Sequence, residues 1–133
     1  MTETDMRRKL KKIGKAGDFS FWPVETHGST LGMADLLFAG RGSGGVLELK
    51  IFHGMAVAMV PFRPGQRGFL KEHARGNPRT FVLGYWPTDG CFYLLGPESG
   101  FLQGYTREEL CEVFAWCNEE LTLDILDVLC GAP

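Results

Sequence analysis

The chain has 133 residues, of which 44% are hydrophobic and 23% charged, values ordinary for one globular domain with its own core. The formal net charge of −2 gives no overall attraction to nucleic acid, and no apolar stretch approaches the roughly 20 residues of a membrane span. Because the four cysteines lack CxxC spacing and no apolar run follows the basic N-terminus, we expect a single domain over 1–133 in a cytoplasmic protein, with reduced thiols, no zinc and no membrane partner.

The first predicted element is a basic helix over residues 4–16, which ends at Gly17. Residues 1–15 carry six bases and two acids, a net charge of +4. Residues 106–133 carry one base and seven acids, a net charge of −6. One interpretation of this asymmetry is a basic working side with an acidic far side, and the other is two solvated helices of opposite sign.

Strands and a hairpin follow this helix. A strand is expected over residues 20–26, and Pro23 favours a place at the edge of a sheet. After a loop, two apolar runs over 34–39 and 45–52 flank the turn GRGSGG, which predicts a β-hairpin. A short extended piece is expected at 56–61.

The second half of the chain predicts more helices and one further strand pair. The expected elements are a helix over 64–75, strands over 80–86 and 91–95, and helices over 107–118 and 121–130. A capping box from Thr106 to Glu109 marks the start of the helix over 107–118. The order α-β-β-β-α-β-β-α predicts an α/β (α+β) fold, with a central mixed sheet flanked by helices.

The predicted hairpin carries three charges that a buried ribbon does not need. Side chains alternate along a strand, so Glu48 and Lys50 share one face while Leu47, Leu49 and Ile51 share the other. Pairing about the turn places Asp35 opposite residue 48 or 49. One interpretation is a surface ion cluster in which Lys50 pairs with Glu48. The other is a divalent-metal site, with carboxylate oxygens as ligands and an ammonium beside them.

The spacing of these residues resembles that of the PD-(D/E)XK nuclease superfamily. Asp35, twelve intervening residues and then Glu48-Leu49-Lys50 match the superfamily pattern. GMADLLF is similar to its glycine-x-proline-aspartate-leucine segment, with Ala34 at the proline position. RPGQRGFLKEH followed by VLGYW is similar to the glutamine-bearing helix and next strand of the VRR-NUC and Holliday-junction-resolvase-like branch, which includes phage proteins. The resemblance covers roughly residues 20–86.

The resemblance implies a restriction-endonuclease-like core and a magnesium-dependent DNA endonuclease, with Mn²⁺ as a substitute and junctions or branched DNA as substrate. Asp35, Glu48 and the Leu49 carbonyl would hold the metal, Lys50 would be the catalytic lysine, and Gln66 would be the helix glutamine. The superfamily often adds an acid from the first helix, for which Glu3 is the first candidate, Asp5 the second and Glu25 another. Without such an acid, the alternative is a catalytically degenerate nucleic-acid-binding or interaction protein.

The resemblance also implies a homodimer, because cutting two strands needs two sites, and it implies no small-molecule cofactor. A phage protein of this kind would work in the host cytoplasm. The apolar stripes of the last two helices are the candidate dimer surface: Leu110, Val113, Phe114, Leu123, Leu126 and Leu129.

The helix over 64–75 also carries a candidate DNA surface. Gln66, Phe69, Leu70 and His73 share the face expected to pack on the sheet. Beside it, bases recur every fourth residue with few acids between them, which favours a phosphate-tracking ridge over a solvated face; they are Arg63, Arg67, Lys71 and Arg75. Ser29 and Thr30 in the loop before Asp35 are further candidates, and Arg7 and Arg8 belong to an alternative path along the first helix. Trp22 and Trp86 are expected in the core.

Overall fold

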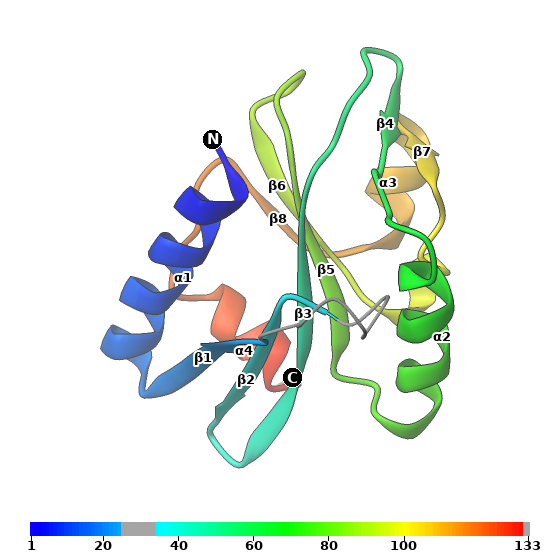
Figure 1. Ribbon diagram of the computed structural model, residues 1–133. Coiled ribbons are helices and arrows are strands. Elements are labelled where there is room, and N and C mark those ends of the chain that lie inside the picture. Colours follow the sequence, from blue (N-terminus) through cyan, green and yellow to red (C-terminus); the bar gives the residue numbers. More distant parts are fainter. Residues whose placement is uncertain (25–33, 132–133) are drawn as a thin grey trace.

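A computed structural model describes residues 1–24 and 34–131, and its main feature is a six-stranded mixed sheet (Figure 1). The strands are β1 (Phe19–Pro23), β2 (Leu36–Gly40), β3 (Ser43–Ile51), β5 (Thr80–Trp86), β6 (Cys91–Leu95) and β8 (Phe114–Asn118). Their order across the sheet is β1-β2-β3-β5-β6-β8. β3 and β5 pair in parallel, and the other neighbours pair antiparallel. β1 is therefore an edge strand, as Pro23 predicts.

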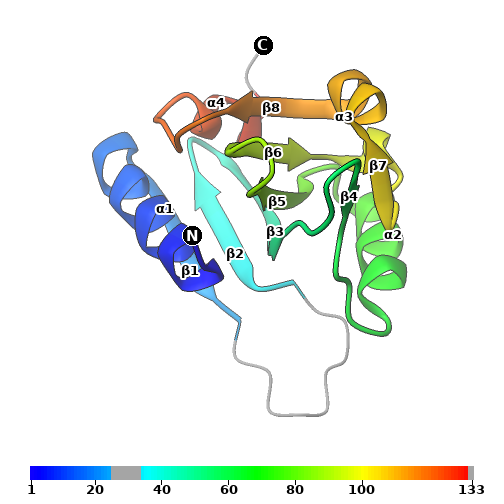
Figure 2. The same ribbon diagram turned by 90° about the horizontal axis from the view of Figure 1, so that it is seen from above.

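Helices and a small second sheet cover the two faces of this sheet (Figure 2). One face carries α1 (Glu3–Gly17) and α4 (Ile125–Leu129), and the other carries α2 (Gln66–Gly76) and α3 (Arg107–Val113). On the α2 side, β4 (Val57–Met59) and β7 (Gly104–Thr106) form the two-stranded sheet, and the 3-10 turn η1 (Pro97–Ser99) precedes β7. None of the helices in residues 1–24 and 34–131 is long and apolar enough to cross a membrane.

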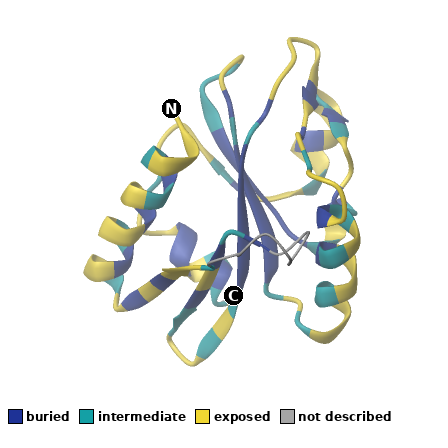
Figure 3. Ribbon diagram, in the orientation of Figure 1, coloured by how far each residue is buried: buried dark blue, intermediate teal, exposed yellow. Residues whose placement is uncertain are grey.

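Each face of the main sheet has its own apolar core. The core under α1 and α4 contains Leu47 and Leu49 of β3, and Phe52, just beyond β3, belongs to the core under α2 and α3. The central strands are accordingly buried along most of their length (Figure 3). This confirms the predicted alternation, which directs Leu47, Leu49 and Ile51 to one face and Glu48 and Lys50 to the other.

The predicted hairpin is present as β2 and β3. Leu36 pairs with Leu47 and Gly40 with Ser43, and Arg41 and Gly42 make the turn with positive φ angles of 54° and 77°. The next residue before β2 is Asp35, so this register carries it opposite Glu48. The helices predicted over 4–16 and 64–75 and the strands predicted over 80–86 and 91–95 are confirmed to within two residues.

The helix predicted over 107–118 is wrong in its second half. The capping box at Thr106 is present, but α3 ends at Val113 and residues 114–118 form β8. β8 pairs with β6 and buries Trp116 in the core beneath α4. The aromatic-rich sequence FAWCN suits a half-buried strand, and this packing outweighs the continuation of a short helix.

The candidate dimer surface is only partly exposed: Leu110, Leu126 and Leu129 are fully buried in the chain's own cores, whereas Phe114 and Leu123 are 37% and 48% exposed. The expectation that Trp22 lies in the core is wrong. Trp22 lies outside the core and is half exposed, unlike Trp86. The four cysteines are free thiols, as expected.

Candidate functional site

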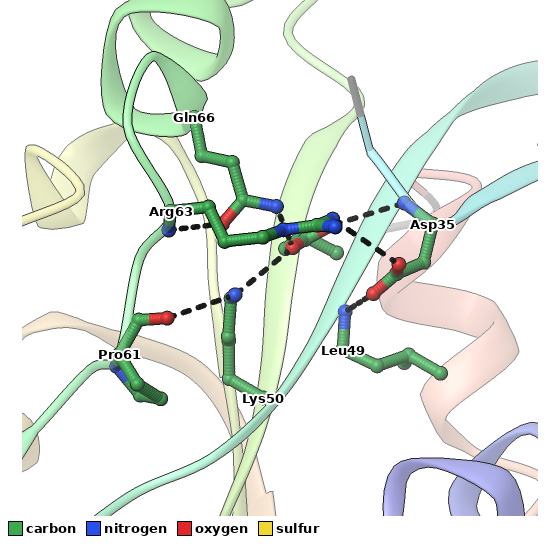
Figure 4. A network of polar contacts seen from close by, with 7 residues as sticks. Asp35, Leu49, Lys50, Pro61, Arg63 and Gln66 are labelled. Atoms are coloured by element: carbon green, nitrogen blue, oxygen red, sulfur yellow. Dashed lines mark hydrogen bonds and ion pairs between the residues drawn. The ribbon is translucent and has the colours of Figure 1, made fainter. Parts of the chain in front are cut away.

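The charged residues of the hairpin meet at the end of β3, under the first turn of α2 (Figure 4). The hairpin register brings the backbone of Asp35 to Glu48, and the Asp35 N–H donates to Glu48 Oε1 over 2.9 Å. In return, the Leu49 N–H donates to Asp35 Oδ2 over 3.0 Å. These two hydrogen bonds fix both carboxylates relative to the backbone of β3.

The Leu49 carbonyl faces the same edge of β3 as its N–H. In an extended strand the N–H and C=O of one residue point to the same side, and the Leu49 N–H points to Asp35. β2 pairs with β3 only as far as Leu47, so no strand of the sheet covers this part of the edge within the described residues. A backbone oxygen therefore lies at the same edge as the Asp35 carboxylate.

Glu48 and Lys50 form a buried pair. Their side chains are 1% and 6% exposed, and Lys50 Nζ lies 3.3 Å from Glu48 Oε2. The ammonium also donates to the Pro61 carbonyl over 3.0 Å and lies 5.8 Å from the Phe62 ring centroid. The pairing of Lys50 with Glu48 is thus observed, but inside the protein rather than on a wet surface.

The site holds more negative than positive charge at its centre. Burial, and next the charge of Asp35, raise the pKa of Glu48 from its ordinary value of 4.5 to about 7, although Lys50 opposes this. Among the described residues, the Arg63 guanidinium also forms an ion pair with this group: it lies 4.0 Å from Asp35 Oδ1 and is largely exposed. Two carboxylates that repel each other in this way are suited to a bound cation.

Gln66 connects the site to α2. It is buried at the first turn of the helix, where Gly65 adopts a positive φ of 86°. Its Oε1 accepts from the Arg63 N–H over 2.8 Å, and its Nε2 donates to Glu48 Oε2. The helical face predicted for Gln66 is confirmed, since Leu70 is buried and Phe69 and His73 are partly buried beside it.

Replacing Gln66 by leucine is expected to lower the free energy of unfolding by about 1–3 kcal/mol, because a buried acceptor and a backbone donor lose their partner. Urea denaturation measures the change. The exposed Gln103 provides a matched control, since Gln103→Leu removes no hydrogen bond made by that side chain within the described residues. Equal stability of the two variants would contradict a structural role for the Gln66 amide.

Glu3, at the start of α1, is an exposed residue on which the charges of the site act. Burial, and next the charge of Asp35, raise the pKa of Glu3, while Lys50, Arg63 and Arg7 lower it. The other candidate on the first helix, Asp5, is instead engaged in the helix cap, where it accepts from the Thr2 N–H.

Three of the sequence candidates, Glu25, Ser29 and Thr30, lie outside the described residues. In the described part of the chain, no three acidic, histidine or cysteine side chains form a group able to hold a metal ion. The candidate metal ligands among the described residues are therefore Asp35, Glu48 and the Leu49 carbonyl, with Glu3 nearby.

The basic residues of α2 differ in their surroundings. Lys71 is exposed, whereas Arg75 lies 3.6 Å from Glu72. Arg67, a member of the predicted ridge, is partly buried, and its Nε donates to the Phe101 carbonyl over 2.7 Å. This hydrogen bond joins α2 to the segment before β7.

The two arginines of α1 also differ. Arg8 is exposed and lies 3.7 Å from Asp5. Arg7 is partly buried, near Glu3, and its Nε has no hydrogen-bond partner among the described residues. Of the two, Arg7 is the one whose charge acts on Glu3.

One partner in the site carried no sequence signal. The Pro61 carbonyl anchors Lys50, and a backbone oxygen cannot be recognised from residue type. The only sequence feature related to this contact is the pair of prolines before α2, Pro61 and Pro64, which restrict the backbone there.

Comparisons with known proteins identify the fold. No family model and no curated protein sequence matches the chain. A solved structure does: Hjc, a Holliday junction resolvase from the archaeal hyperthermophile Archaeoglobus fulgidus, matches with a TM-score of 0.61 over 83% of this chain and 93% of that one. The chain has the fold of that resolvase. The sequence identity is 13%, and the predicted fold class, a nuclease-like mixed sheet flanked by helices, is confirmed.

Proposed function

We propose that the protein is a metal-dependent DNA endonuclease that hydrolyses phosphodiester bonds and acts on branched DNA. The observation that carries this proposal is the group formed by the buried Glu48, Lys50 and Gln66 and the partly buried Asp35 at the open edge of β3. It occurs in the fold of a protein described as a Holliday junction resolvase. The sequence pattern resembles that of the PD-(D/E)XK superfamily. The proposal includes membership of its VRR-NUC and resolvase-like branch and an origin in a phage.

The donors fit a hard divalent cation. Mg²⁺ takes oxygen ligands and is commonly held by one or two carboxylates plus waters and substrate phosphates. Asp35 and Glu48 supply two carboxylates and Leu49 a carbonyl, and Glu3 is close enough to respond to the charge of Asp35. A bound Mg²⁺, or Mn²⁺ in its place, would supply an activated water and polarise the phosphoryl oxygen.

The protein's own residues then have distinct tasks. The Lys50 ammonium, held by Glu48 and Pro61, stabilises the negative charge that develops on the phosphate in the transition state. Gln66 holds Glu48 in one orientation through a hydrogen bond to Oε2. The exposed Arg63 guanidinium lies at the outer oxygen of Asp35, where a DNA phosphate approaching the site would meet it.

The rival function is a nucleic-acid-binding protein that keeps the fold without catalysis. It is favoured by the missing three-acid cluster in the described residues and by the net charge of −2. Cleavage of both strands of a junction needs two sites, so the nuclease proposal includes a homodimer, whereas the rival does not need one.

A panel of labelled DNA structures separates the two functions. The panel contains a four-way junction, a flap, a single strand and a plain duplex, each incubated with the protein and Mg²⁺ or EDTA. The nuclease proposal expects metal-dependent cleavage of a branched substrate, and heat on titration with Mn²⁺. Binding of DNA without cleavage in either metal, and without heat of metal binding, would establish the rival.

The basic residues of α2 make a separate prediction about the path of DNA. Lys71→Ala is expected to weaken duplex binding and reduce the slope of log K against log salt by about 0.9, because one released counterion is lost. Since Lys71 is exposed, the melting temperature stays unchanged. Arg67→Ala is expected to lower it, because the Phe101 carbonyl loses its donor. An unchanged slope for Lys71→Ala with a smaller slope for Lys12→Ala would place the duplex along α1.

A further inference from the structure

An exposed aromatic residue lies on the same face of the sheet as the candidate site. Trp22 of β1 is 51% exposed and pairs with Leu37 of β2, which is 45% exposed. Leu37 in turn pairs with Val46 of β3. Every second residue of a strand lies on one face, so Val46 shares its face with Glu48 and Lys50. The other two tryptophans, Trp86 and Trp116, are buried.

The exposed pair is close to the carboxylates. Trp22 lies two strands away from β3. The cross-strand row that contains Trp22 and Leu37 reaches β3 at Val46, two residues before Glu48. With ordinary strand spacing and rise, this places the backbone of Trp22 about 12 Å from that of Glu48. The backbone of β1 continues toward the site, because the Val24 N–H donates to the Asp35 carbonyl over 2.9 Å.

Positive charge lies next to the strand that carries Trp22, on the opposite face of the sheet, which α1 covers. A hollow of about 220 Å³ runs along β1, lined by Trp22, Phe19, Ser20 and Phe21 and by Lys11 and Lys15 of α1. Both lysines are exposed, and neither has an ion pair within the described residues. An exposed aromatic ring and two lysines gathered at one edge of a sheet are the kinds of group that bind single-stranded nucleic acid, with bases stacked on the ring and phosphates near the cations.

The same features oppose a second protein chain at this edge. Pro23 cannot donate a hydrogen bond to an added strand, and lysines beside an edge strand repel a like-charged copy of the chain. A negatively charged strand with exposed bases meets neither obstacle. Charge and chemistry therefore favour a nucleic-acid occupant.

We propose that Trp22 and Leu37, with Lys11 and Lys15, bind an unpaired stretch of the DNA strand beside the site, with a base stacked on the Trp22 indole. The position of this stretch relative to a cut rests on the proposed nuclease function, but the binding itself does not. An unpaired nucleotide stacked on Trp22, whose backbone lies about 12 Å from that of Glu48, would be available in DNA with a single-stranded branch and absent from an intact duplex, so this surface would favour branched substrates of that kind.

Binding of an oligothymidylate of about ten nucleotides, in EDTA so that no strand is cut, tests the proposal. Trp22→Leu is expected to weaken binding about tenfold, since the stacking plane is lost, and Trp22→Phe should stay within about threefold of the wild type. Phe114→Leu is the matched control, an aromatic substitution at the opposite edge of the sheet, and should leave the affinity unchanged. Tryptophan fluorescence of the wild type, but not of Trp22→Phe, should be quenched on binding.

The lysines are tested by salt dependence. Lys11→Ala and Lys15→Ala should each reduce the slope of log K against log salt by about 0.7, the value for a phosphate contact with a single strand. Each variant is compared with Lys9→Ala, which removes the same charge from another side of α1. Circular dichroism confirms that all the variants fold.

Several results would overturn the proposal: no binding of the oligothymidylate by the wild type, equal affinity for Trp22→Leu, or a wild-type dimer that Trp22→Leu dissociates without any change in DNA affinity. The last would make this edge an interface between copies of the chain. If the wild type cleaves no DNA but Trp22→Leu weakens binding, the nuclease function fails and the single-strand surface stands.

Discussion

Lys50→Ala is expected to lower the rate of DNA cleavage at least about a hundredfold, the scale of losing one charge partner of the transition state. Lys50 Nζ lies 3.3 Å from Glu48 Oε2, so it is held beside the carboxylate that would bind the metal. Its loss removes the one ammonium in the buried group but leaves both carboxylates in place. Single-turnover cleavage of a labelled junction at saturating Mg²⁺ measures the chemical step directly.

Controls separate catalysis from folding in this experiment. Because Lys50 is buried, Lys50→Met keeps most of the aliphatic packing while removing the charge, and should be as inactive as Lys50→Ala. Lys9→Ala makes the same charge change at an exposed site and should cleave normally. Wild-type turnover by Lys50→Met at saturating Mg²⁺ would show that the lysine only balances the charge of Glu48.

The sequence predicts the local geometry of the site because that geometry follows from strand alternation and hairpin register. The turn over Arg41 and Gly42 sets the pairing, and the pairing brings Asp35 to Glu48. The helical periodicity of α2 likewise places Gln66 toward the sheet, where it meets Glu48. These contacts depend on a few residues close in sequence, or on one strand neighbour.

Features decided by distant packing were not predictable in the same way. Residues 114–118 form a strand because β6 offers a free edge and Trp116 fills the core, and a capping box says nothing about either. Trp22 is exposed because it lies on an edge strand, on the face away from α1, whereas its neighbour Phe21 points into the core. A tryptophan near a proline carries no sequence mark of which face it will take.

Asp35→Asn is expected to abolish metal binding and cleavage while stabilising the metal-free protein. The asparagine Oδ1 can still accept from the Leu49 N–H, and the amide nitrogen would then lie where the second oxygen faces Glu48 and Arg63. In the variant, an amide that can donate to Glu48 replaces a carboxylate that repels it. Glu48→Gln has the opposite effect on stability, because three donors from Asp35, Lys50 and Gln66 face this side chain and an amide satisfies fewer of them.

The pH dependence of unfolding measures this effect in EDTA. The pKa of Glu48 in the folded protein, about 7, lies above its ordinary value of 4.5, so the folded state holds a proton that the unfolded state has released between these values. Wild-type stability therefore falls as the pH rises through this window and stays lower above it. Asp35→Asn removes the second largest cause of the raised pKa. It should unfold with a free energy about 1 kcal/mol higher than the wild type near pH 8, and the difference should shrink toward pH 5.

The same titration distinguishes a metal site from a structural ion-pair network. If Asp35 and Glu48 form a cation site, the metal-free wild type carries their repulsion at high pH, and Mg²⁺ should relieve it in the wild type but not in Asp35→Asn. If both carboxylates instead serve to hold Lys50 and Arg63, Asp35→Asn would melt below the wild type at every pH because an ion pair is lost. Melting curves of the two proteins with and without Mg²⁺ at about pH 8 therefore decide between them.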